Sequence, residues 1–247
     1  MEWNNTLIRC SSIGKIMTEP KTKADKEAGN LSKTAQSHLI EVYAKEKYGR
    51  ERDFSNKYTE KGIAVEEDSI TLLARVLKRM LKKNEERLYN DFISGLPDVY
   101  DGETILTADV ITDVKSSWSI HTFLKNLTEE DINSDYYWQL QGYMDLTGAK
   151  SAIIAYCLVN TPPHLIETEK YYLLKNLNVI SEESPEYKEA VAKLEKEMIF
   201  DDISLSERIL LQKVNRNQED IDLMHNKVIK CREFLKELEE KHLNYNS

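Results

Sequence analysis

Hydrophobic residues recur at helical spacing through the first part of the chain. They predict a short helix over residues 6–18, which a serine caps and Pro20 ends. After a polar loop, a run of good helix formers predicts a second helix that ends near Gly49. A longer helix is predicted from Thr59 to the basic run 78–83, because apolar side chains return there every three or four residues.

The hydrophobic period changes beyond this helix. Residues 92–99 and 105–114 are rich in β-branched and aromatic side chains, and an Asp-Gly turn signal lies between them, so we predict two neighbouring strands. Helical spacing returns over 135–146. The nearly continuous apolar run 151–159 predicts a buried strand, and a further short strand is predicted over 171–174.

The chain is mostly charged and helical in pattern from Ser184 to its end. This order of elements predicts an α/β fold in which helices flank a central mixed β-sheet. We expect one domain over 1–180 and a helical C-terminal extension over 181–247, packed on the same domain. The apolar positions of the extension, which either pack on the domain or form a partner surface, are Ile209, Leu210, Val214, Ile221, Met224, Val228, Phe234 and Leu235.

Composition excludes several classes of protein. The 247 residues carry 43 acidic and 34 basic side chains, a net charge of −9, so a broad cationic surface for nucleic acid is not expected. A nucleic-acid site would be local or assisted by a metal ion. The three cysteines are scattered, which disfavours a disulfide framework, a zinc site and an iron–sulfur cluster. With neither a signal peptide nor an apolar run of about 18 residues, we expect a cytoplasmic protein.

Candidate chemistry centres on two short segments, Pro97-Asp98 and Asp113-Val114-Lys115. An acid two residues before a lysine occurs four times in the chain, but only Asp113 lies in an apolar, β-branched run. Strand alternation there places Asp113 and Lys115 on one face, together with Asp109 and an isoleucine. Charges gathered on a strand face are costly unless something compensates them.

A divalent cation is the compensation that we predict. Mg²⁺ prefers oxygen ligands and is typically held by one or two carboxylates together with substrate phosphate. Asp98 and Asp113 are the candidate ligands, and Lys115 is placed to hold or help deprotonate an attacking water, which predicts phosphodiester hydrolysis. The alternative is that Asp98 is a turn residue and that Asp113 and Lys115 form an ion pair at a sheet edge.

These segments resemble the signature of the PD-(D/E)XK nuclease superfamily. Two further sequence motifs resemble those of one subset of the superfamily, which contains lambda exonuclease, the YqaJ-type phage recombinases and the RecB nuclease domain. One is the Gly-x-x-x-Glu pattern from Gly62 to Glu66, and the other is the Gln-x-x-x-Tyr pattern from Gln139 to Tyr143. The resemblance covers roughly Thr6 to Val159 and implies a restriction-endonuclease-like core. The second acid is Asp113, where these relatives more often have Glu.

The resemblance also implies roles for individual residues. Glu66 and the backbone carbonyl of Val114 would join Asp98 and Asp113 as metal ligands, with Glu67 as the alternative to Glu66. The cofactor implied is Mg²⁺, with Mn²⁺ able to substitute, as one or two ions. The ordinary alternative for Glu66 is an exposed acid in the first turn of a helix.

Two polar residues on one helix complete the catalytic set that the resemblance implies. Gln139 and Tyr143 lie one turn apart and would orient the DNA phosphate or the catalytic water. The alternative for both side chains is plain helix packing.

Two groups of candidate DNA contacts lie outside this set. Arg9, Ser11 and Ser12 look like the family's phosphate-binding element near a helix start, although a serine cap and a surface arginine explain them equally well. Ser116 and Trp118 follow the predicted catalytic strand, and Trp118 either stacks on a base or covers the sheet edge.

The leading functional hypothesis is a Mg²⁺-dependent DNA exonuclease of the phage recombination type. Such an enzyme digests one strand of a duplex from its end, so that a single-strand annealing protein coats the other strand. Family analogy adds a ring-shaped homotrimer. The alternatives are a structure- or sequence-specific endonuclease on the same core and a non-catalytic DNA-binding module.

Overall fold

The computed structural model describes residues 2–52, 56–128, 132–177 and 181–245. Its α-helices are α1 (Ile13–Met17), α2 (Lys23–Glu27), α3 (Lys33–Tyr48), α4 (Lys57–Ala64), α5 (Glu66–Leu77), α6 (Ile120–Thr128), α7 (Ser134–Thr147), α8 (Pro163–Asn176), α9 (Pro185–Met198) and α10 (Gln218–Asn244). Its 3-10 helices are η1 (Trp3–Asn5), η2 (Cys10–Ser12) and η3 (Leu205–Arg208). Its strands are β1 (Ile8–Arg9), β2 (Lys82–Lys83), β3 (Leu88–Tyr89), β4 (Ile93–Gly95), β5 (Val99–Tyr100), β6 (Val110–Ser116), β7 (Ser151–Cys157) and β8 (Ile209–Asn215).

A five-stranded mixed sheet in the order β2-β5-β6-β7-β8 forms the centre of the molecule. Strands β6 and β7 are parallel over their whole length, and β8 is antiparallel to β7. The parallel pair requires a crossover, which α6 and α7 provide. A smaller sheet in the order β1-β4-β3 lies beside it. The predicted α/β class with a central mixed sheet is confirmed.

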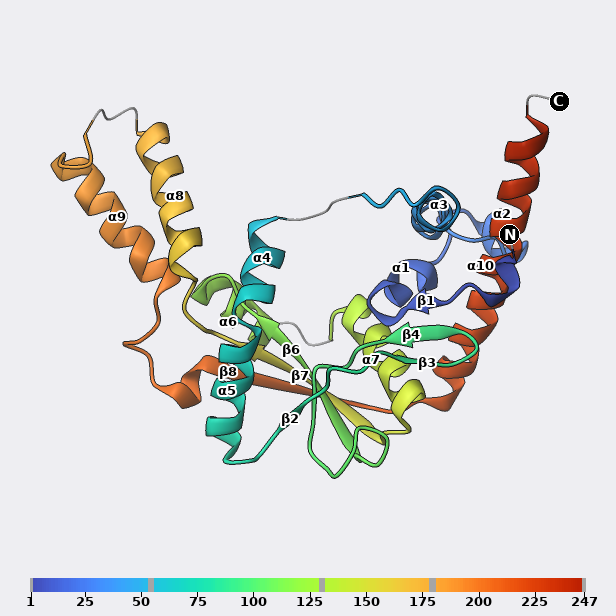
Figure 1. The fold of residues 1–247 in the computed structure, drawn as a ribbon, viewed down its shortest axis with the longest axis horizontal. Helices are drawn as coiled ribbons and strands as arrows, with labels where there is room; N and C mark the ends of the chain where they lie inside the picture. The colour runs from blue at the N-terminus through green and yellow to red at the C-terminus, as the bar shows by residue number, and fades with distance from the viewer. Residues whose placement is uncertain (1, 53–55, 129–131, 178–180, 246–247) are drawn as a thin grey trace.

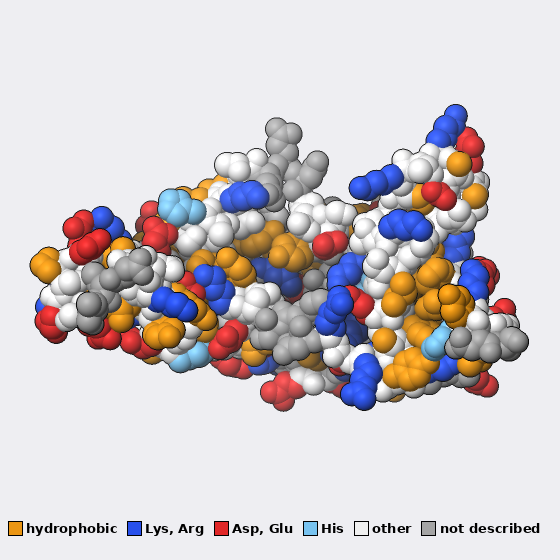
Figure 2. All heavy atoms as spheres, turned by 90° about the horizontal axis from the view of Figure 1, so that it is seen from above, with side chains coloured by type: hydrophobic (Ala, Val, Ile, Leu, Met, Phe, Trp, Pro, Cys, Tyr) orange, Lys and Arg blue, Asp and Glu red, His pale blue; other side chains and the backbone are white. Residues whose placement is uncertain are grey.

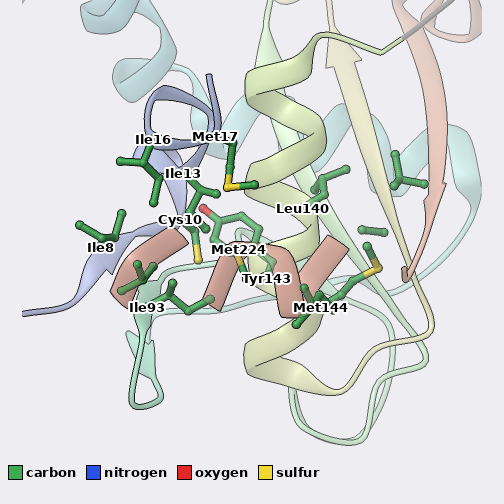
Figure 3. Close-up of a cluster of buried hydrophobic side chains, with 14 of the residues drawn as sticks. Ile8, Cys10, Ile13, Ile16, Met17, Ile93, Leu140, Tyr143, Met144 and Met224 are labelled. Carbon is green, nitrogen blue, oxygen red and sulfur yellow. The ribbon is translucent and has the colours of Figure 1, made fainter. Parts of the chain in front are cut away.

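Helices cover both faces of the central sheet (Figure 1). One apolar cluster joins the Ile111 and Ile154 side of the sheet to α1, α3, α7 and α10, and Figure 3 shows part of it around Leu140 and Met224. A second cluster joins the opposite side, which includes Val99, to α5. Strand β6 is therefore covered on both faces.

Several predicted elements of the N-terminal half have different bounds. The first helix is only α1, because Ile8 and Arg9 form a strand that pairs with Ile93 and Ser94. The single long helix predicted from Thr59 is wrong, since it is divided at position 65 into α4 and α5. Three successive acids open α5, and the dipole at a helix N-terminus favours negative charge there.

In the C-terminal half, α7, β7 and α9 confirm the predicted elements, and α9 begins just after Ser184, whose side chain caps it. The strand predicted over 171–174 is wrong, because these residues lie inside α8. Residues 209–215, predicted to be helical, form β8 instead. The edge of the apolar strand β7 supplies a pairing partner there, and that pairing overrides a weak helical pattern.

The last helix packs on the domain and is not a free surface. The side chains of Ile221, Met224, Val228 and Leu235 are fully buried against the first cluster. Helices α8 and α9 form a hairpin that projects from the body at the opposite end of the molecule (Figure 1). In the ranges that the structure describes, no helix combines the length and the apolar character that crossing a membrane would need.

Candidate active site

The predicted catalytic strand is β6, and its alternation is as expected. Asp113 is 2 % exposed and points with Lys115 toward α7, while Ser116 points toward α5 and shares a hydrogen bond of 2.8 Å with Ser69. The Lys115 ammonium donates to the Asp113 carboxylate, with 2.7 Å between Nζ and Oδ2. The Lys115 nitrogen also lies 5.0 Å from the centroid of the Tyr136 ring. The acid and the lysine of the motif therefore form a close, largely buried pair.

Asp98 reaches the same end of β6 from the residue before β5. The backbone N–H of Val114 donates to Asp98 Oδ2 over 2.7 Å. Because the N–H and C=O of a strand residue point to the same side, the Val114 carbonyl faces the side on which Asp98 lies. The two segments of the motif, separated in sequence, are thus joined directly by a hydrogen bond from the backbone of one to the side chain of the other.

A buried asparagine that the sequence analysis missed holds the Pro97-Asp98 segment. Asn84 donates its side-chain N–H to the Pro97 carbonyl over 3.0 Å, and its backbone N–H donates to the Asp98 carbonyl over 2.8 Å. Asn84 lies just beyond the basic run, and its type and spacing carry no recognisable signal in the sequence. Only the pairing of β2 with β5 brings it to this position.

The two carboxyl groups, Asp98 and Asp113, give the site an excess of negative charge. Burial, together with the neighbouring Asp113 carboxylate, raises the pKa of Asp98 to about 7, although the Val114 N–H and Lys115 oppose the shift. Burial lowers the pKa of Lys115, but the attraction of Asp113 and Asp98 outweighs it and leaves that pKa above its usual value. One lysine therefore serves two buried carboxyl groups.

Helix α7 brings Gln139 and Tyr143 to the same site. The Gln139 side-chain amide donates to Asp113 Oδ1 over 3.2 Å and to the Tyr143 hydroxyl over 2.8 Å. Burial, and secondarily the nearby Asp113 charge, raises the pKa of Tyr143, so its hydroxyl stays protonated. The chain Tyr143, Gln139, Asp113, Lys115 is a continuous hydrogen-bonded network across α7 and β6.

Two glycines allow this close approach. A Cβ placed at Gly95 would lie 2.7 Å from the Cys10 sulfur and 2.8 Å from the Tyr143 ring. A Cβ at Gly142 would lie 2.6 Å from Ile13 and 2.9 Å from the same sulfur. Figure 3 shows the side chains of Cys10 and Tyr143 that these two glycines approach. The glycine before Leu96-Pro97-Asp98 thus lets α7 pack onto the strand that leads to the site.

Glu66 stands at the edge of the site as the first residue of α5. Its carboxylate pairs with Lys83 over 2.9 Å, and Glu67 pairs with the same lysine over 2.5 Å. Glu66 is nevertheless near enough to contribute to the raised pKa of Asp98. Of the two acids it is the less exposed, with 37 % of its side chain accessible against 73 % for Glu67.

Asp109, on the same strand face as Asp113, does not join the site. It is exposed and pairs with Lys150 over 2.9 Å beyond the other end of β6. In the described residues no group of three or more Asp, Glu, His or Cys side chains is gathered closely enough to hold a metal ion. The assembled set is the two carboxylates of Asp98 and Asp113 beside the Val114 backbone.

This all-oxygen set fits a hard cation that keeps several water ligands. The fit rests on the donor types and on the burial of Asp98 beside the Asp113 carboxylate, which together raise the pKa of Asp98. Neither histidine nor thiol lies in the set, which disfavours a site of the zinc type.

The first group of predicted DNA contacts lies apart from the carboxylates. Arg9 and Ser12 line a cleft of about 200 Å³ together with Lys15 and Arg52, and Arg9 approaches Glu51 at 3.7 Å. Ser11 is exposed, and Ser12 precedes α1 without making a side-chain capping bond. Among described residues, no hydrogen bond or ion pair links these three side chains to Asp98 or Asp113.

The second group, Ser116 and Trp118, lies directly beyond Lys115. Both line another cleft, of about 300 Å³. A buried lysine of α4, Lys61, holds the segment in place by donating to the carbonyls of Ser117 and Trp118 over 2.8 and 3.1 Å. The sequence analysis missed Lys61. Its spacing of four residues from the buried Val65, which places it on the apolar stripe, is the signal that would have found it.

Comparison with known proteins gives a clear result only for solved structures. Neither the protein-family models nor the curated proteins contain a match to this chain. The fold is similar to a phage-related exonuclease from Haemophilus somnus 129PT, with a TM-score of 0.72 and 31 % sequence identity over 96 % of this chain and 97 % of that one.

The fold is also similar to LHK-Exo, an alkaline exonuclease from Laribacter hongkongensis. The TM-score is 0.62 at 12 % identity, over 99 % of this chain and 98 % of that one. Its complex with dAMP gives the same TM-score and identity over 97 % and 94 % of the two chains. At this identity the likeness concerns the fold alone.

Proposed function

Because this chain belongs to the family of phage-related exonucleases, we propose that it is a divalent-metal-dependent exonuclease that hydrolyses phosphodiester bonds of double-stranded DNA from an end. The observation that carries this proposal is the network at the end of β6. There Asp98, Asp113 and Lys115 lie together under Gln139, as phosphodiester hydrolysis requires.

Asp98, Asp113 and the Val114 carbonyl would hold Mg²⁺ or Mn²⁺, as one or two ions, and Glu66 would add a ligand from α5, directly or through water. When bound, the ion would polarise the phosphate and lower the pKa of a water molecule. Asp98 and Asp113 are pre-positioned for this by the Val114 N–H and by Gln139, so little reorganisation accompanies binding.

Lys115 acts as a fixed positive charge beside the reacting phosphate. Its contact with Asp113 keeps the ammonium group protonated and anchored at Nζ. That charge would stabilise the negative charge that grows on the phosphate as the water attacks. Gln139 holds the Asp113 carboxylate, and the Tyr143 hydroxyl accepts a hydrogen bond from Gln139 on the other side.

The DNA contacts expected outside this network remain part of the proposal. Arg9, Ser11 and Ser12 would bind backbone phosphate on the N-terminal side of the site. Ser116 and Trp118 would contact the strand on the opposite side, beyond Lys115. The net charge of −9 disfavours DNA binding over the rest of the surface and so confines it to these places.

The test is digestion of end-labelled linear duplex DNA, with Mg²⁺ and with EDTA, beside a closed circle of the same sequence. Mg²⁺-dependent release of mononucleotides from the linear DNA alone would establish the exonuclease, and the label lost first would give its polarity. Cutting of the closed circle would favour the endonuclease. If no divalent metal supported cleavage, the DNA-binding module would be the better description.

We also propose a biological setting by analogy with the family. The enzyme would act in phage-type DNA recombination in the cytoplasm, with a single-strand annealing protein and as a ring-shaped trimer. Light scattering of the purified protein tests the trimer, since a monomeric mass at working concentration would contradict it.

A further inference from the structure

Two adjacent residues at the end of β2, Lys83 and Asn84, contact two of the three acids proposed as metal ligands. Lys83 is paired with the first residue of β5 in the antiparallel ladder, so Asn84 lies opposite Asp98. The side chain of Lys83 forms an ion pair with Glu66. Neither Lys83 nor Asn84 belongs to the proposed ligand set, so any effect that they have on a bound cation acts through the acid that each one contacts.

Asn84 holds both peptide groups that flank the α-carbon of Asp98. Its side-chain N–H donates to the Pro97 carbonyl over 3.0 Å, and its backbone N–H donates to the Asp98 carbonyl over 2.8 Å. The first carbonyl belongs to the peptide group before this α-carbon, and the second to the peptide group after it. The direction in which the Asp98 side chain leaves the backbone is therefore fixed, and only two side-chain torsions remain.

The Asn84 side chain is chemically suited to this place. It is 6 % exposed, its amide also donates to the Glu86 carbonyl over 2.9 Å, and its oxygen accepts from the Glu86 N–H over 3.3 Å. Leucine and aspartate have a similar shape but lack the two donors. Pro97 has no N–H of its own, so its segment cannot be held by donating a ladder hydrogen bond. The asparagine supplies the support that strand pairing leaves out.

The Asp98 carboxylate is held at one oxygen and open at the other. Its Oδ2 accepts from the Val114 N–H over 2.7 Å, whereas no donor from the described residues reaches Oδ1. A carboxylate that is fixed through its backbone and through one oxygen is already in place when a cation binds to it. Residues that hold a metal ligand in this way typically contribute tenfold to a hundredfold in metal affinity.

Lys83 acts on the other side of the site, through Glu66. Acidic and basic side chains are interspersed over the face of the molecule in Figure 2, so an ion pair is by itself no sign of function. Lys83 differs because it bridges two carboxylates, Glu66 over 2.9 Å and Glu67 over 2.5 Å. Glu66 is also close enough to raise the pKa of Asp98, so a cation at the carboxylates would compete with Lys83 for it. Lys83 would still keep Glu67 as its partner.

From these contacts we propose that Lys83 and Asn84 together set how tightly the site binds its divalent cation. Asn84 is a positioning residue that strengthens binding by fixing Asp98. Lys83 weakens binding, because it holds Glu66 and adds a positive charge beside the site. This inference rests on the proposed function, since it concerns the cation proposed there. Two neighbouring residues that act with opposite sign are not what a purely structural role for β2 would produce.

Binding of Mn²⁺ to the protein without DNA tests this directly. Electron paramagnetic resonance measures the free Mn²⁺, and the binding that disappears in Asp113→Asn defines the site. Asn84→Ala should weaken this binding about tenfold. Lys83→Met should strengthen it about twofold to fivefold, as expected for the loss of a partly exposed ion pair. Weaker binding in both variants, or unchanged binding in both, would overturn the proposal.

Each variant has a matched control on the same part of the chain. Asn90→Ala also removes an asparagine that holds a turn, since its oxygen accepts from two backbone N–H groups over 2.9 Å, but it contacts no proposed ligand. Lys82→Met removes a lysine that donates to the Glu103 carbonyl. Both controls should bind Mn²⁺ like the wild type. Equal weakening in Asn90→Ala and Asn84→Ala would mean that lost stability, not positioning, is the cause.

The folding of Asn84→Ala is checked by its melting temperature beside that of Asn90→Ala. Should Asn84→Ala fail to fold, Asn84→Ser keeps one donor at this position and should weaken Mn²⁺ binding in the same direction. Lys83→Met alters a side chain that is one-third exposed and tests the opposite sign independently.

Nuclease assays separate this inference from the proposed function. On linear duplex DNA, the Mg²⁺ concentration for half-maximal cleavage should rise about tenfold in Asn84→Ala and fall in Lys83→Met, and excess Mg²⁺ should restore the rate of Asn84→Ala. If the wild type cleaves and all variants share its Mg²⁺ dependence, Lys83 and Asn84 do not set the affinity and the exonuclease stands. A wild-type protein that neither binds Mn²⁺ at this site nor cleaves DNA would contradict both.

Discussion

Two buried charges of opposite sign lie on either side of the same strand end. Asp98 and Asp113 share one lysine, so negative charge is in excess there. Against the segment that follows β6, Lys61 is buried without a carboxylate from any described residue. Each arrangement costs folding free energy, and each is what a ligand of opposite sign would compensate. The two places therefore differ in the sign of the charge that is left without a full partner among the described residues.

Asp145 is a buried acid whose role is structural. Asp145 accepts hydrogen bonds of 2.7 Å from both Asn90 and His225, and Arg216 lies 3.8 Å away. Its carboxylate has partners from α10, from the turn before β4 and from Arg216, the residue after β8. Burial of an acid is therefore not by itself a sign of function in this protein. The lack of full compensation is what distinguishes the end of β6.

The largest expected effect comes from Asp113→Asn. Removing one carboxylate while keeping its shape should lower the rate of DNA cleavage at least about a thousandfold, because the metal loses a ligand and Lys115 its partner. The matched control is Asp109→Asn on the same strand face, which should cleave at the wild-type rate. Unfolding of Asp113→Asn would point to a structural ion pair instead.

A smaller effect, on stability, is expected for Asp98→Asn. The pKa of Asp98 in the folded protein is about 7, above its usual value, so the folded state binds more protons than the unfolded state between about pH 4 and pH 7. Stability of the metal-free protein should thus fall as the pH rises through that window. At pH 8, Asp98→Asn should raise the melting temperature by about 5 °C.

Asp145→Asn is the variant to compare with Asp98→Asn, by calorimetry of the metal-free proteins. It should lower the melting temperature, because His225 and Asn90 would no longer face a charged carboxylate. Melting temperatures that fall alike for the two variants would remove the distinction between a compensated and an uncompensated acid.

The opposite pH dependence is expected for Lys61. Its pKa in the folded protein is about 8, below the usual 10.5, so the unfolded state binds more protons between these values and stability should rise with pH there. Lys61→Met should remove that slope and stabilise the protein at pH 7 by about 1 to 3 kcal/mol. Urea unfolding across this pH range measures both. A less stable Lys61→Met at every pH would mean that the lysine serves packing alone.

The smallest effect is expected for Tyr143→Phe. It removes the hydroxyl that accepts from Gln139 but keeps the ring against Gly95, so kcat should fall by about three- to tenfold with folding unchanged. Single-turnover cleavage measures it. Thr147→Ser, on the same helix and away from the carboxylates, is the control. A cleavage rate equal to wild type in Tyr143→Phe would mean that the Tyr143 hydroxyl does not contribute to catalysis.

Local patterns in the sequence were enough for several parts of this description. Strand alternation around Asp113 and the one-turn spacing of Gln139 and Tyr143 are local properties, and the structure brings these residues together as expected. The division of the long helix at position 65 and the strand β8 were not predicted. Each depends on packing or pairing with a segment far away in the chain, which a periodic pattern does not encode.

The sequence by itself determined the two apolar strands β6 and β7, the motif and its resemblance to a nuclease family, because residue type and spacing are local. Only the tertiary structure decided which charges are compensated. The Val114 N–H on Asp98, the Asn84 clamp and the buried Lys61 each join segments distant in sequence. Electrostatic cost depends on burial and on distances of a few ångströms, and these are set only when the elements pack.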